Sequence, residues 1–98
     1  MRLFWTSEAI EDRRSIYDYI ESDNPRAALD LDESLSKKAG RLIVHPGLGR
    51  PGRIKGTREF IAFRNYILVY DIANNSVRIL RVLHAARMYP PFKEKRTP

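Results

Sequence analysis

The chain has 98 residues, 43% of them hydrophobic, and a formal net charge of +6, which suits one small domain with a modest core and argues against general disorder. It contains no cysteine, so disulfides and thiolate metal sites are excluded and a cytoplasmic location is expected. No apolar run reaches the roughly 18 residues that a membrane-spanning helix needs, and the first residues lack the pattern of a signal peptide.

A short strand and a helix are predicted at the start of the chain. Residues Arg2–Trp5 form an apolar run that is too short for a helix, and we interpret them as a strand. Thr6 or Ser7 then offers a hydroxyl N-cap. An apolar stripe at three- and four-residue steps continues to Ile20. This helix should stop near Asn24, because the proline that follows disfavours helical geometry in the residue before it.

A second helix is predicted from Pro25 to about Val44. Proline suits the first turn of a helix, and a second apolar stripe follows it. Gly40 weakens such a helix by roughly 1 kcal/mol relative to alanine. We therefore expect a kink or an early end there.

The second half of the chain predicts a loop and three strands. His45–Gly52 has a turn-forming residue at nearly every step. Strands are expected at Thr57–Phe63, Asn65–Ile72 and Val77–His84, with a hairpin turn at Asn74-Asn75-Ser76. The fold class is therefore α+β: an N-terminal strand, a two-helix hairpin packed on one face, and three antiparallel strands in a small sheet. We expect one domain over residues 1–92 and a basic tail at 93–98.

Four segments carry a family resemblance. They are HPGLGRPG (His45–Gly52), GTRE (Gly56–Glu59), NYILVYDI (Asn65–Ile72) and RVLHAAR (Arg81–Arg87). In this order they resemble the RelE/ParE superfamily of toxins from bacterial type II toxin–antitoxin pairs, over residues 1 to about 90. The resemblance implies a small toxin that a cognate antitoxin neutralises by wrapping around it.

Two activities occur on this fold, and the resemblance favours one of them. ParE-like members inhibit DNA gyrase without chemistry of their own, whereas RelE-like members are ribosome-dependent mRNA endoribonucleases. The RVLHAAR segment is similar to the closing strand of ParE-like toxins. Ile67 stands where RelE-like toxins carry a basic residue, and Arg58 is the only cation of the REFIAF strand. A gyrase inhibitor is expected, and the alternative partners are the ribosome and mRNA.

Cleavage of RNA without a metal needs a general base, a general acid and cations for the charged transition state. If the chain is a ribonuclease, the expected catalytic residues are His84, Arg87, Tyr89 and Arg58. His84 is the best candidate, because its unperturbed pKa lies near neutrality. The alternative is a histidine at a strand end that bonds a backbone carbonyl. Tyr89 is more often a packing residue.

Positive charge is concentrated in the second half of the chain. Residues 50–98 contain 11 Lys and Arg against 3 Asp and Glu, and a strongly basic end usually binds an anionic partner. Ribosomal and messenger RNA or an acidic antitoxin segment would both fit. The candidate target-binding or nucleic-acid-binding residues are Arg53, Lys55, Arg58, Arg64, Arg81 and Arg87.

The remaining patterns imply no cofactor, no metal and no small-molecule substrate. The glycines of GLGRPG have dinucleotide-binding spacing, but they follow a helix and precede a strand, which is the reverse of that motif. The strand aromatics are interpreted as core rather than as base-stacking platforms. We also expect the antitoxin to cover an apolar surplus on the helices, formed by Ile16, Ile20, Leu31 and Leu35.

Overall fold

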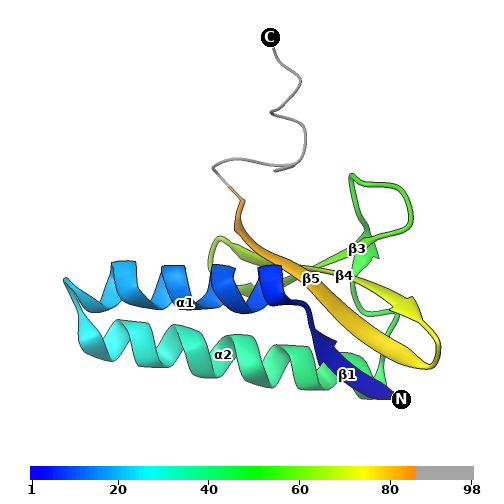
Figure 1. Ribbon diagram of the computed structural model, residues 1–98, viewed down its shortest axis with the longest axis horizontal. Helices are drawn as coiled ribbons and strands as arrows, with labels where there is room; N and C mark the ends of the chain where they lie inside the picture. The colour runs from blue at the N-terminus through cyan, green and yellow to red at the C-terminus, as the bar shows by residue number, and fades with distance from the viewer. Residues whose placement is uncertain (86–98) are drawn as a thin grey trace, which may run out of the picture.

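The sheet has five strands in the order β1-β5-β4-β3-β2, and both helices cover one of its faces (Figure 1). The computed structural model describes residues 1–85. The tail expected at 93–98 and the end of the domain expected at 1–92 therefore lie outside the described residues. Within them, the expected α+β architecture is confirmed.

The strand β1 (Arg2–Trp5) and the helix α1 (Ser7–Glu21) lie where the sequence predicts them. The Thr6 hydroxyl caps α1 by accepting a hydrogen bond of 3.1 Å from the Ala9 amide. The helix ends at Glu21, close to the end near Asn24 that the sequence predicts, and the backbone of Asn24 is not helical (φ −151°, ψ 89°). The Asn24 side chain instead caps the next helix.

The helix α2 (Pro25–Val44) runs past Gly40, so the expectation of an early end was wrong. Leu35, Ala39 and Leu42, on either side of the glycine, are almost completely buried. Burial of a leucine contributes about 1.5–3 kcal/mol, which exceeds the cost of one helical glycine.

The sheet is mostly antiparallel, as expected, with β3 (Arg58–Phe63), β4 (Tyr66–Ala73) and β5 (Ser76–His84) hydrogen-bonded in chain order. The strand β1 pairs with β5 in parallel, because the helical hairpin carries the chain back across the sheet. A two-residue strand, β2 (Arg50–Pro51), pairs with β3. Two residues are too few to show a period of two, so the sequence did not predict it.

A β-bulge in β5 changes which of its residues face the helices. Val69 on β4 is paired with Arg81, but the next residue, Tyr70, is paired with Ile79, so Leu80 is extra. Ile79 and Val82 therefore both join the core below the sheet. Leu80, the extra residue, is only partly buried.

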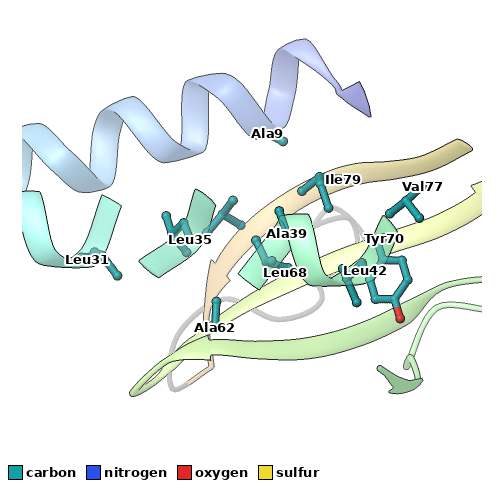
Figure 2. Close-up of a cluster of buried hydrophobic side chains, with 11 residues drawn as sticks. Ala9, Leu31, Leu35, Ala39, Leu42, Ala62, Leu68, Tyr70, Val77 and Ile79 are labelled. Atoms are coloured by element: carbon teal, nitrogen blue, oxygen red, sulfur yellow. The ribbon is translucent and has the colours of Figure 1, made fainter. Parts of the chain in front are cut away.

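The main core lies between the sheet and the helices (Figure 2). Its largest completely buried side chains include Tyr70, Leu31, Leu35 and Leu68. Leu31 and Leu35 are therefore buried in the core and do not form the exposed apolar surface that we expected an antitoxin to cover. Ile16 packs against the same core. Ile67 belongs to a smaller buried cluster with Val69 and Leu83.

Candidate functional site

The buried side chain of Tyr70 anchors the loop between α2 and β2 by hydrogen bonds of its hydroxyl group. Its hydroxyl donates a hydrogen bond of 2.6 Å to the carbonyl of Pro46 and accepts one of 2.9 Å from the amide of Gly49. A Cβ atom at position 49 would lie 2.7 Å from the tyrosine ring and hydroxyl. Only glycine allows this approach, so the loop packs closely on a buried anchor.

Glu59 holds the next part of the loop. Its side chain is only 2% exposed, and it accepts a hydrogen bond of 2.9 Å from the backbone amide of Arg53. The guanidinium of Arg50, its partner across β2 and β3, lies 3.6 Å from the same carboxylate. A buried carboxylate is tolerated only when it is paired and hydrogen-bonded. Glu59 therefore fixes the geometry of the two arginines beside it.

Arg58, a predicted site residue, is part of the same scaffold. Its guanidinium donates a hydrogen bond of 2.6 Å to the carbonyl of Gly49. Thr57 closes the hairpin, because its hydroxyl donates to the carbonyl of Ile54 at 2.6 Å and its carbonyl accepts from the amide of Gly52 at 2.8 Å. We call the segment Arg50–Arg58 the basic hairpin. It also carries Arg50, which is not among the site residues predicted from the sequence although it lies close to Arg53.

Arg81, a second predicted site residue, forms an ion pair between layers. Its guanidinium donates two hydrogen bonds, of 2.7 and 2.9 Å, to the carboxylate of Asp12 on α1. The same carboxylate accepts a 2.9 Å hydrogen bond from the backbone amide of Val82. The hydrogen bonds to Asp12 raise the pKa of Arg81 above its ordinary value. Arg81 thus ties β5 to α1.

His84 lies at the end of β5, where its ring packs edge-on against Tyr66 with 5.0 Å between the ring centroids. Tyr66 is also its partner across the strands. Arg58, in contrast, is opposite Tyr70, four residues further along β4. Four residues of strand span about 13 Å, and β4 itself lies between the histidine and the arginine. The structure therefore separates His84 from Arg58.

The other predicted cations also divide. Arg53 and Lys55 lie with Arg58 in the basic hairpin, at the start of β3. Arg64 is in the turn at the opposite end of that strand, at φ 47°, with its guanidinium 5.3 Å from the centre of the Phe63 ring. Arg87 and Tyr89 lie outside the described residues. The candidate cations therefore lie on at least two separate surfaces, one at each end of β3.

An open groove of about 380 Å³ runs beside the first turns of α1. Trp5, Ile10 and Tyr17 supply apolar surface, and Ile10 is 49% exposed. The guanidinium of Arg13 stacks on Trp5 at 4.7 Å from the ring centre and bonds Asp32 of α2 at 2.6 Å. The groove is therefore an ordered, partly apolar surface on the helical side.

In residues 1–85, no group of three His, Asp or Glu side chains is placed to hold a metal ion. Neither helix in that range is long and apolar enough to cross a membrane.

These features define a small α+β protein with a basic hairpin at one end of its sheet, and comparison with known proteins identifies its class. Residues 3–89 match the family described as the ParE toxin of the type II toxin–antitoxin system parDE. The chain therefore belongs to the ParE toxin family, within the RelE/ParE superfamily of type II toxins.

Individual relatives agree with this assignment. A candidate toxin of Sinorhizobium fredii, Y4kP, is 40% identical over 90 residues, which is 91% of this chain and 93% of that protein. The toxin RelE2 of Caulobacter vibrioides is 33% identical over 87 residues, covering 89% and 98%. The solved chromosomal ParDE system of P. aeruginosa contains a chain with a TM-score of 0.77 and 26% identity, covering 86% of this chain and 95% of that one.

Proposed function

We propose that this toxin acts by inhibiting DNA gyrase and that a cognate antitoxin neutralises it. Membership of the ParE family supports the proposal, because the resemblance to ParE-like toxins implies gyrase inhibition. The observation that carries the proposal is the separation of two ribonuclease candidates: Arg58 lies about 13 Å along the sheet from His84, with β4 between them. Acid–base catalysis needs its groups within hydrogen-bonding reach of one substrate.

The test is a supercoiling reaction with purified gyrase, ATP and relaxed plasmid. We expect supercoiling to decline with rising toxin concentration and to recover when the antitoxin is added. Toxin that has been mixed with its antitoxin beforehand is the control for the inhibited state. Normal supercoiling at a toxin concentration that arrests growth would refute gyrase as the target.

A RelE-like mRNA endoribonuclease is the second candidate. It is favoured by the 33% identity to a protein named as a RelE toxin and by the position of His84 at the end of β5. Its test is cleavage of a defined mRNA on stalled ribosomes. Site-specific cuts that disappear in His84→Ala would favour this reading over gyrase inhibition.

The groove beside α1 is the surface that we assign to the antitoxin. Ile10 is half exposed there, next to Trp5 and two arginines. A partner segment with an apolar side and acidic flanks would complement it. Ile10→Asp should weaken antitoxin binding by at least tenfold and leave target inhibition unchanged. Ser15→Asp, on an exposed position of the same helix, is the matched control.

A further inference from the structure

We propose that the basic hairpin is a binding arm for the sugar-phosphate backbone of duplex DNA, so that this toxin engages its target enzyme on DNA. The proposal rests on the proposed function, because gyrase is an enzyme that holds duplex DNA. It adds a second contact, made by the toxin itself to the nucleic acid.

The first argument is the concentration of charge. The basic hairpin contains Arg50, Arg53, Lys55 and Arg58, and the next residue, Glu59, is the nearest acid in the chain. The segment from 50 to 59 therefore carries a net charge of +3. The side chain of Arg50 is 63% exposed, whereas that of Glu59 is 2% exposed. A partner at this surface meets the cations and not the carboxylate.

The second argument is preorganisation. Flexible basic loops lose conformational entropy when they bind, at about 0.5–1.5 kcal/mol for each long side chain that becomes ordered, in addition to the cost of ordering the backbone. The backbone of this hairpin is already held by Glu59 and Thr57, and Tyr70 holds Gly49 directly before it. Its cations are thus presented on a fixed frame, as a site that recognises a regular array of phosphates requires.

The third argument is shape. The green segment between α2 and β3 rises from the sheet on the side away from the helices (Figure 1). Its base is paired at the edge of the sheet, with Arg50 opposite Glu59 and Pro51 opposite Arg58, and residues 52–57 form a narrow turn between the two strands. The major groove of duplex DNA is about 12 Å wide and admits elements as broad as a two-stranded ribbon, so it has room for this turn. Backbone contacts by such an arm need no base sequence.

The test measures anisotropy of a labelled 20-base-pair duplex with the full-length toxin, without gyrase, from 50 to 200 mM salt. We expect micromolar affinity. The net charge of +3 on residues 50–59 corresponds to three phosphate contacts, which predict a slope of about −2.7 when the logarithm of the binding constant is plotted against the logarithm of the salt concentration. The double variant Arg53→Glu with Lys55→Glu should bind at least tenfold more weakly and reduce the slope to about −1.

The matched control changes the same net charge elsewhere. Arg26→Glu with Lys37→Glu alters two exposed positions of α2, and it should weaken binding no more than about twofold at 150 mM salt, where charges further away than about 8 Å are screened. Equal losses in the two double variants would overturn the arm, because net charge alone would then explain binding.

Two competitors distinguish other partners. Polyglutamate at equal charge, or single-stranded RNA of equal length, should displace the duplex at least tenfold less well than unlabelled duplex. Equal or better displacement by either would overturn the assignment to duplex DNA. Failure of the wild-type toxin to inhibit gyrase would refute the proposed function, but the duplex measurement would still decide whether the hairpin binds DNA.

Discussion

Asp12 on α1 and Arg81 on β5 are 69 residues apart in sequence and form a two-pronged ion pair across the two layers. The Asp12 carboxylate also accepts a hydrogen bond from the backbone amide of Val82. This amide lies on the part of β5 that extends beyond its pairing with β1, which ends at Ile79. One carboxylate therefore neutralises an arginine and occupies a donor on an otherwise open strand edge.

Replacement of Asp12 by alanine should reduce stability. The change removes three hydrogen bonds that share one charged group, and the net contribution of a hydrogen bond to a charged group is about 1.5–3 kcal/mol. We expect the free energy of unfolding to fall by about 2–3 kcal/mol in urea denaturation, because the pair is only partly buried. Asp18→Ala, at an exposed position on the same helix, should change it by less than about 0.5 kcal/mol. Equal effects would contradict the role of Asp12.

The stabilisation by this pair should not depend on the titration of its arginine near neutral pH. The pKa of Arg81 is raised, mainly by its hydrogen bonds to Asp12. A raised pKa adds stability that is complete below the unfolded value and lost only as the pH rises through the folded one. Arginine titrates above about pH 12. The stability difference between wild type and Asp12→Ala should thus be equal at about pH 7 and pH 10, and a loss of half of it by pH 10 would contradict this assignment.

The sequence predicted the elements of this fold because each has a local signal. Thr6 as a cap, Pro25 at a helix start and the Asn74-Asn75 turn all act within a few residues. It could not predict the Asp12–Arg81 pair, which depends on how distant elements pack. The sequence also did not predict the bulge at Leu80 in β5, because a bulge leaves the apolar composition of a strand unchanged.

Two glycines should respond in opposite directions to alanine. Gly49→Ala places a methyl group 2.7 Å from Tyr70 and 2.9 Å from the carbonyl of Glu59. We expect a loss of about 2 kcal/mol or more, in the range of overpacked cores. Gly40→Ala meets nothing within 4 Å in α2, and it should stabilise by about 0.5–1 kcal/mol. Thermal unfolding of both variants checks this, and a stabilising Gly49→Ala would refute the close packing of the loop.

Removal of the Tyr70 hydroxyl should loosen the basic hairpin selectively. Tyr70→Phe keeps the buried ring but leaves the Gly49 amide and the Pro46 carbonyl without their partner. Stability should fall by about 1–3 kcal/mol, and the Gly49 amide should exchange with solvent at least tenfold faster. Tyr19→Phe, at a side chain that is 68% exposed, is the control. Unchanged exchange at Gly49 would show that the hydroxyl does not hold the loop.

The sequence located the cations of the site but not their grouping. Arg53, Lys55, Arg58 and Arg64 fall within 12 residues of sequence, which suggested one surface. An extended strand spans about 3.3 Å per residue, so β3 carries Arg64 to the opposite end of the sheet from Arg53. The anchors Tyr70 and Glu59 were not predicted as such, because a strand tyrosine and a strand glutamate have no distinctive spacing.

His84 distinguishes the two candidate activities. For a gyrase inhibitor there is no transition state to stabilise, so truncation acts through affinity, and most contact residues cost less than about 1 kcal/mol. Toxicity of His84→Ala should then fall by no more than about fivefold, with similar graded losses for Arg87→Ala and Tyr89→Phe. A ribonuclease that used His84 as a general acid or base would lose about 10² to 10⁴ in rate. Growth arrest at titrated expression levels measures the difference, and antitoxin binding by each variant reports that it remains folded. Complete loss of toxicity in His84→Ala alone, with a bell-shaped pH profile of RNA cleavage, would overturn gyrase inhibition.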